Sequence, residues 1–344
     1  MIWLTWRQCR TQFLAVYGLV AAACVWLAIT GPALARLARR HENVYDLLTA
    51  NDRLLFNGGI AALAVAPAVI GIFWGAPLVA RELETGTHRL AWNQSVTRGH
   101  WLAAKLAFSV VATALAVGIL TTAITWWAHP IDGVTGSQRG SLASRLTPVS
   151  FAMRGVVPVG YAVFALLLGT LIGLILRRSV PAMALALAVY VVIQVAVPLW
   201  VRPHLVPALT TSTVISHSTL DGIGIDDSGA ITITTRVPKG AWMLSNQTVD
   251  ARGRAVALPA WFSDCVPPPP AGGASEGGRV SFEPRAGTMD ACLARLTDQG
   301  YRQRVVYQPA DHFWPLQWVE TGLYLAASGV LAALSFWWTR RRLS

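Results

Sequence analysis

The chain has 344 residues, of which 54% are hydrophobic and only 13% are charged. A water-soluble protein carries about a quarter charged residues, so the composition excludes an ordinary soluble protein and predicts an all-α polytopic membrane protein. The net charge of +11 does not indicate nucleic-acid binding, because the arginines lie mostly at the ends of apolar runs, where they anchor and orient membrane helices.

Residues 1–12 are predicted to form a short helix that lies in the membrane interface. Apolar residues recur there at helical spacing: Ile2, Trp6, Cys9 and Phe13. Arg7 and Arg10 fall on a neighbouring face, so Trp6, Arg7 and Arg10 are the predicted interfacial residues. A frayed start of the first membrane span would show the same periodicity, and this alternative stays open.

Six apolar runs are each long enough to cross a bilayer, which takes about 20 helical residues. They are residues 13–35, 58–80, 101–127, 155–176, 179–201 and 321–339. The first run exceeds the roughly 7–15 apolar residues of a signal peptide, so we interpret it as an uncleaved span. An even number of spans leaves both termini on one side. The larger share of Arg and Lys on that side predicts cytoplasmic termini in a multi-pass membrane protein.

The most informative segment is the charged stretch 81–105, between the second and third runs. It holds six charged side chains: Arg81, Glu82, Glu84, Arg89, Arg98 and Lys105. A connection between neighbouring helices needs only about 2–8 residues. Because this stretch is longer and also carries Leu90 and Trp92, we predict that it docks on a cytoplasmic partner. A solvated connector, charged only to set topology, is the alternative.

Residues 202–315 are long enough to form a small α+β domain outside the membrane, between the fifth and sixth spans. Ile231, Ile233 and Thr235 alternate with exposed positions, as in a half-buried strand. A helix is predicted from the spacing of Met289, Cys292, Leu293 and Leu296. Thr288 would cap this helix and Gly300 would end it. Residues 316–344 then form the sixth span and a basic cytoplasmic tail.

Cys265 and Cys292 both lie in this domain, which the charge distribution places outside the cell. Two thiols in an oxidising compartment usually pair, so a disulfide is predicted. Two reduced thiols would instead indicate a cytoplasmic domain and an inverted topology.

The sequence also limits the energy source. No ionisable residue lies inside the six runs away from their ends, which argues against a carrier driven by protons or sodium ions. The two lysines, Lys105 and Lys239, follow Ala104 and Pro238 rather than the glycine of a P-loop. We therefore expect no metal and no cofactor on this chain, and expect ATP and Mg²⁺ on a separate ATPase.

A membrane enzyme is the rival class. Its candidate groups would be His204, His217, His312, Asp221, Asp226 and Asp311. These residues do not have the spacing of a known metal or catalytic motif, so scattered surface residues are the simpler interpretation.

The stretch 81–105 resembles the loop between the second and third helices of ABC-2 exporter permeases, which docks on an ATPase. The resemblance rests on Glu82 or Glu84, Gly86, Thr87, Leu90, Arg98 and Lys105. The chain departs from the family pattern at Ser95, where Pro is usual, and at Ala104, where Gly is usual. The interfacial segment, the six spans and the outer domain are similar to the same family, and within it to permeases common in actinobacteria. The resemblance thus implies a location in the bacterial plasma membrane.

The resemblance implies a permease subunit without catalytic activity, which exports a drug, a lipid or a peptide-like substrate. It assigns coupling to the ATPase to Glu82, Glu84, Gly86, Thr87, Arg89, Leu90, Arg98 and Lys105. It also implies a second permease, either another copy or a homologous chain. A signalling or ligand-sensing membrane protein is the alternative.

Overall fold

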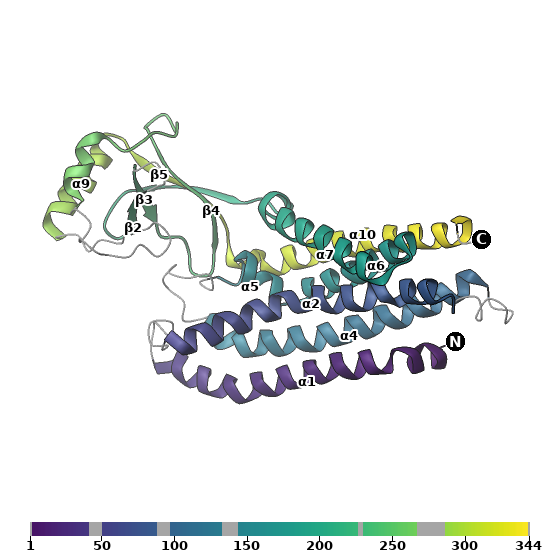
Figure 1. The fold of residues 1–344 in the computed structure, drawn as a ribbon. Helices are drawn as coiled ribbons and strands as arrows, with labels where there is room; N and C mark the ends of the chain where they lie inside the picture. Colours follow the sequence, from purple (N-terminus) through teal and green to yellow (C-terminus); the bar gives the residue numbers. More distant parts are fainter. Residues whose placement is uncertain are drawn as a thin grey trace. The chain divides into compact units, whose positions relative to one another are not determined.

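The structure, a computed structural model, describes residues 2–40, 50–87, 97–132, 144–225, 230–266 and 286–342. The chain divides into two compact units (Figure 1). Met1–Val206 and Phe313–Ser344 form a helical unit, and Pro207–His312 form a smaller unit of mixed secondary structure. The predicted outer domain, residues 202–315, therefore began five residues too early, because Arg202 is buried inside the helical unit.

Within the described residues, the helical unit has six helices that are long and apolar enough to cross a membrane, as predicted. They are α1 (Ile2–Arg40), α2 (Ala50–Thr85), α4 (Arg98–Asp132), α6 (Val157–Leu176), α7 (Ser179–Ala196) and α10 (Phe313–Arg342). A π-helical turn (Val197–Val201) continues α7 into the short helix α8 (Arg202–Leu205), and α5 (Pro148–Met153) precedes α6.

Two further predicted boundaries were wrong. Residues 2–12 do not form a separate helix, because α1 runs unbroken from Ile2 to Arg40. Both ends of the charged stretch 81–105 are helical, because α2 continues to Thr85 and α4 begins at Arg98. A helix satisfies its own backbone hydrogen bonds, so it can extend beyond the apolar run wherever its charged side chains find water or partners.

The closest helix packing in this unit is between α2 and α6, and it depends on glycine. Gly71 and Gly75 of α2 face α6, while Gly169 and Gly173 of α6 face α2. A Cβ atom added to Gly75 would lie 2.2 Å from the carbonyl oxygen of Leu166. The two backbones therefore approach to a distance that any larger residue would prevent, as is common between membrane helices.

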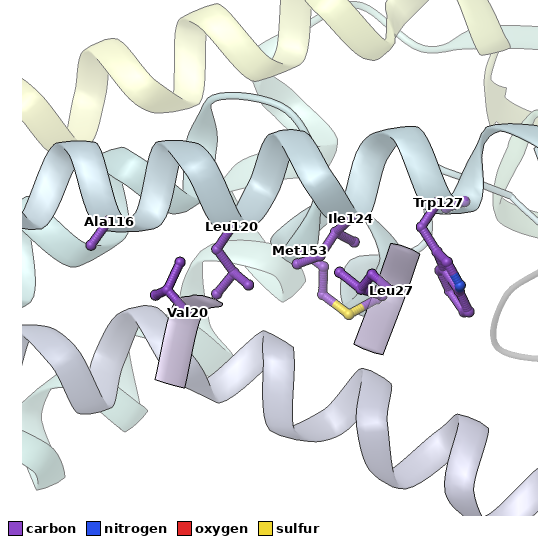
Figure 2. Packing of buried hydrophobic residues seen from close by; sticks show 8 residues of the cluster. Val20, Leu27, Ala116, Leu120, Ile124, Trp127 and Met153 are labelled. Carbon is purple, nitrogen blue, oxygen red and sulfur yellow. The ribbon is translucent and has the colours of Figure 1, made fainter. Parts of the chain in front are cut away.

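A second contact joins α1 to α4 through apolar side chains. Figure 2 shows these side chains on the facing sides of the two helices, with one contribution from α5: Val20, Leu27, Ala116, Leu120, Ile124, Trp127 and Met153. At one end of this contact, the indole nitrogen of Trp127 donates a hydrogen bond of 3.0 Å to the hydroxyl of Thr30. The hydroxyl of Tyr17 in α1 also donates to the carbonyl oxygen of Ala112 in α4 at 2.9 Å. The contact therefore holds α1 to the rest of the unit by burial and by these polar links.

The mixed unit contains two small antiparallel sheets. The larger has the strand order β1 (Leu209–Val214), β5 (Arg302–Gln308), β4 (Trp242–Val249). The smaller pairs β2 (Leu220–Ile225) with β3 (Ile231–Thr235), the strand predicted from alternation. Both strands of the smaller sheet contribute to an apolar core with helix α9 (Ala286–Asp298) and the 3₁₀ turn Ala260–Cys265.

Helix α9 confirms the predicted apolar spacing, since Met289, Leu293 and Leu296 are all buried in this core. The predicted cap was wrong, because the helix already begins at Ala286 and Thr288 lies within its first turn. Gly300 does end the helix with a left-handed backbone (φ 83°). The amide of Tyr301 reaches back to the carbonyl of Leu296 at 3.0 Å, which is the usual glycine-based helix stop.

The predicted disulfide is present between Cys265 and Cys292. It joins the end of the 3₁₀ turn to the middle of α9, across 27 residues of sequence. Beside it, the guanidinium of Arg295 lies 4.3 Å from the ring centre of Trp261. The bond and this stacking contact hold α9 against the core.

Candidate functional site

The candidate site is the end of the helical unit at which α2 stops and α4 and α7 start. Helix α2 stops because Gly86 takes up a left-handed backbone (φ 74°), a conformation that favours glycine. The hydroxyl of Thr85 donates to the carbonyl oxygen of Arg81 at 2.8 Å, and it lies 3.0 Å from the hydroxyl of Thr87. The Gly-Thr pair of the predicted motif therefore marks the exit from α2.

Two predicted residues, Glu82 of α2 and Lys105 of α4, form an ion pair. The Nζ atom of Lys105 lies 2.5 Å from Oε1 of Glu82, and the two side chains are only 6% and 16% exposed. The same ammonium group donates to the carbonyl oxygen of Leu78 at 3.4 Å and lies 4.9 Å from the ring centre of Trp101. Since α2 and α4 flank residues 86–97, this pair fixes the two helices from which that connection departs.

A third predicted residue, Glu84, does not join this pair and contacts α7 instead. Its Oε2 atom accepts hydrogen bonds from the backbone N–H of Ser179 at 3.2 Å and from the Ser179 hydroxyl at 2.9 Å. Ser179 is the first residue of α7, where backbone N–H groups lack helical partners and a carboxylate is stabilising. Glu84 therefore fastens the end of α2 to the start of α7.

The turn between α6 and α7 adds a link to α10. Arg177 has a left-handed backbone (φ 55°), and its Nη2 donates to the carbonyl oxygen of Arg342 at 3.1 Å. Figure 1 shows the two chain ends at this same end of the helical unit. We call the group of Glu82, Glu84, Lys105, Arg177 and Ser179 the coupling end.

The remaining predicted site residues are only partly described. Arg98 is the first residue of α4 and is half-buried, and Arg10 is exposed on α1. Arg89, Leu90 and the side chains of Trp6 and Arg7 lie outside the described residues. Their predicted roles stay predictions.

A buried polar cluster toward the other end of α7 and α10 was not predicted. Arg202 of α8 binds Glu320 of α10 through two hydrogen bonds, Nε to Oε2 at 2.8 Å and Nη2 to Oε1 at 3.0 Å. The hydroxyl of Tyr161 in α6 donates to Glu320 and accepts from Arg202. Both charged side chains are fully buried. The sequence did carry a signal, because opposite charges at the adjoining ends of spans five and six could pair.

Gln317, one turn before Glu320, closes the break between α5 and α6. Its Oε1 accepts from the backbone N–H groups of Val156 and Val157 at 3.0 and 2.9 Å, and its Nε2 donates to the carbonyl oxygen of Phe151 at 3.3 Å. These bonds satisfy backbone groups that neither helix can satisfy. Helix α10 therefore holds both α8 and the start of α6.

A cleft of about 880 Å³ runs along α1 and α2 and reaches the start of α7. Most of its lining is apolar, and its polar residues are Arg81, Glu84, Thr85 and Ser179. Two of these, Glu84 and Ser179, belong to the coupling end. The cleft and the coupling end therefore share the junction between α2 and α7.

Among the described residues, the candidate groups of an enzyme form no metal-binding cluster. In the part of the chain that the structure describes, no three His, Cys, Asp or Glu side chains are placed to hold a metal ion. His312 has a local partner, with its Nδ1 2.7 Å from Oε1 of Gln308, and Nδ1 of His204 lies 2.9 Å from the carbonyl oxygen of Trp200. Asp226 lies outside the described residues.

Six apolar helices with buried charge pairs between them define a multi-pass membrane protein. Residues 17–202 match the sequence model of the family described as ABC-2 membrane transporter related, and the chain belongs to this family. The matched part runs from α1 to Arg202 and includes Glu82, Glu84, Lys105 and Ser179. No curated protein and no solved structure matched the chain. Permeases of this family belong to ABC transporters and usually work with an ATPase partner.

Proposed function

We propose that this chain is the transmembrane permease subunit of an ATP-driven exporter. The observation that carries the proposal is the pair of links at the coupling end, Glu82 with Lys105 and Glu84 with Ser179. Together they join the helices on either side of residues 86–97 to α7, which borders the cleft. A displacement of residues 86–97 would therefore be transmitted to helices that line the cleft.

A separate ATPase supplies the energy in this proposal and holds the ATP and Mg²⁺. Family membership supports this partner, and neither lysine of the chain follows a glycine as a P-loop requires. The coupling residues then divide into two groups. Glu82, Glu84 and Lys105 position the connection from inside the chain. Gly86, Thr87, Arg89 and Leu90 lie along it, Arg98 follows it at the start of α4, and these five residues contact the ATPase. A second permease, identical or homologous, completes the pathway.

The proposed orientation places both termini and the coupling end in the cytoplasm and the mixed unit outside. The larger share of Arg and Lys on the side of the termini supports it. The disulfide of the mixed unit also supports it, because disulfides persist in oxidising compartments.

The test is transport by liposomes that contain this permease together with a P-loop ATPase that co-purifies with it. Lys105→Met should lower ATP-dependent transport by roughly tenfold, equal to about 1.4 kcal/mol of coupling free energy, because Glu82 loses its counter-charge and the two helices lose their link. Lys239→Met, which changes the only other lysine at an exposed position of the mixed unit, should transport like the wild type. Normal transport by a folded, ATPase-bound Lys105→Met protein would contradict the proposal for this pair.

The alternative is ATP-linked or ligand-sensing membrane signalling. The observation that favours it is the mixed unit, which has its own apolar core and disulfide and is more than a connection between two helices needs. Signalling would be favoured if a ligand of the mixed unit changed the rate of ATP hydrolysis by the complex while no compound crossed the liposome membrane.

A further inference from the structure

The apolar part of the cleft has the dimensions of a lipid chain. Its walls are residues of α1 between Ala15 and Ala23 and residues of α2 between Ala66 and Pro77, with Leu120 of α4. Eleven residue steps of helix, from Ala66 to Pro77, cover about 16 Å. Half of a bilayer's hydrocarbon core is about 15 Å thick. One acyl chain of a single leaflet therefore matches the apolar length of the cleft.

This apolar wall is open to an occupant. Leu19 of α1 is 71% exposed, and Val69 and Phe73 of α2 are 44% and 55% exposed. All three line the cleft. An extended hydrocarbon chain would cover them from both helices at once.

The polar end of the cleft carries one cation, Arg81, and one carboxylate, Glu84. The guanidinium of Arg81 is exposed and has no hydrogen-bond or ion-pair partner among the residues that the structure describes. Glu84 differs, because its Oε2 atom already accepts two hydrogen bonds from Ser179. Arg178 is exposed beside Glu84 and close enough to interact with its charge. Within the cleft lining, Glu84 is therefore partly occupied by Ser179, whereas the donors of Arg81 are free to bind an anion.

We propose that the cleft binds a membrane phospholipid, with an acyl chain between α1 and α2 and the phosphate on Arg81. A guanidinium suits this role because its parallel N–H groups bind two phosphate oxygens together. The assignment of a cargo rests on the proposed function. If the chain is an exporter permease, phospholipid-like amphiphiles are its class of cargo.

The test uses the full chain in phosphatidylcholine liposomes that contain a small fraction of phosphatidylglycerol with a photoreactive acyl chain. After illumination, peptides of α1 and α2 that line the cleft should carry the label. Arg81→Gln should lower this labelling about tenfold, because charge-assisted hydrogen bonds to the phosphate are lost, and Arg81→Lys should lower it less. The matched control is Arg36→Gln, an exposed arginine of α1 outside the cleft, which should label like the wild type.

Competition by unlabelled lipids distinguishes a site that binds the headgroup from a non-specific apolar surface. Unlabelled phosphatidylglycerol should compete, whereas diacylglycerol, which lacks the phosphate, should not. Equal labelling of the wild type and Arg81→Gln, or equal competition by both lipids, would show ordinary boundary lipid and overturn the proposal. Efficient crosslinking between two chains through Leu19→Cys, without lipid label in the cleft, would show that a second copy occupies it and would also overturn the proposal. The labelling experiments contain no ATPase and do not depend on transport. If lipid labelling behaves as expected but the permease and its ATPase do not transport in the separate liposome assay, only the proposed function is contradicted.

Discussion

Arg202 and Glu320 place a full positive and a full negative charge where no water reaches either side chain. The bidentate geometry and the hydroxyl of Tyr161 compensate Glu320, while the guanidinium also stacks 4.3 Å from the ring centre of Phe151. Burying such a pair adds little net stability, but removing one member leaves an uncompensated charge. The pair therefore matters more for which helices meet than for the total free energy of folding.

We predict that Glu320→Ala lowers the free energy of unfolding by about 3–5 kcal/mol, because Arg202 stays buried without a counter-charge. The double variant Arg202→Met with Glu320→Leu should regain most of this loss, since two apolar side chains of similar size need no compensation. Unfolding of the purified protein in detergent by increasing denaturant measures both. A double variant as unstable as Glu320→Ala would contradict this account of the pair.

At the residue scale, the sequence identified charged residues but not their partners. Glu82, Glu84 and Lys105 were all selected from the resemblance, and the structure pairs the first with the third. The partner of Glu84 is Ser179, 95 residues away in the sequence. A serine at the start of a span has no sequence feature that predicts a hydrogen bond to a particular carboxylate. Arg202 and Glu320 were treated as the ends of separate spans, because the packing that brings α8 to α10 cannot be read from hydropathy.

Between elements, the contact of α2 with α6 is the most sensitive to a single atom. We predict that Gly75→Ala destabilises the helical unit by about 3 kcal/mol, because the new methyl group would meet the backbone of Leu166 and force the helices apart. Gly118→Ala in α4 is the control, since nothing lies within 4 Å of its added Cβ. That change should be neutral or stabilising by up to about 1 kcal/mol. Equal unfolding midpoints for the two variants would rule out the close approach.

The disulfide joins two segments of the mixed unit, Cys265 at the end of the 3₁₀ turn and Cys292 in α9. We predict that Cys292→Ser makes α9 sensitive to protease and lowers the free energy of unfolding of this unit by about 3 kcal/mol, because a loop spanning 27 residues is no longer closed. Reduction of the wild type should reproduce the effect, whereas the helical unit should resist digestion in both samples. Mass spectrometry of digests with and without reductant follows each fragment, and free thiols at both positions in native membranes would contradict the prediction.

Elements with a regular local pattern were predictable, and those made by distant pairing were not. The six spans follow from apolar length alone, and β3 and α9 follow from their periodicity. The sheet of β1, β5 and β4 was missed because Leu209 pairs with Tyr307, nearly a hundred residues further along the chain. Periodicity also could not show that residues 2–12 continue α1, since an interfacial helix and a longer span have the same spacing.

At the scale of the whole molecule, the even number of spans puts both termini and the coupling end on the same side of the membrane. Both chain ends lie at the end of the helical unit where α2 passes into α4, so a cytoplasmic ATPase can reach that connection only if the termini are cytoplasmic as well. Along the chain, the mixed unit follows α8 and precedes α10. One measurement of which side the termini face therefore tests both the proposed topology and the proposed function.

We predict that an impermeant maleimide, applied to intact cells after reduction by an impermeant phosphine, labels Cys265 and Cys292. An engineered Arg341→Cys at the exposed end of α10 should react only after the cells are opened, since it shares the cytoplasmic side with the coupling end. The physical reason is that two thiols joined as a disulfide belong to the oxidising side, and the excess arginine at the termini is retained on the other. Labelling of Arg341→Cys in intact cells, with both native cysteines protected, would show that the topology is inverted. The coupling end would then lie outside the cell, where a cytoplasmic ATPase cannot reach it.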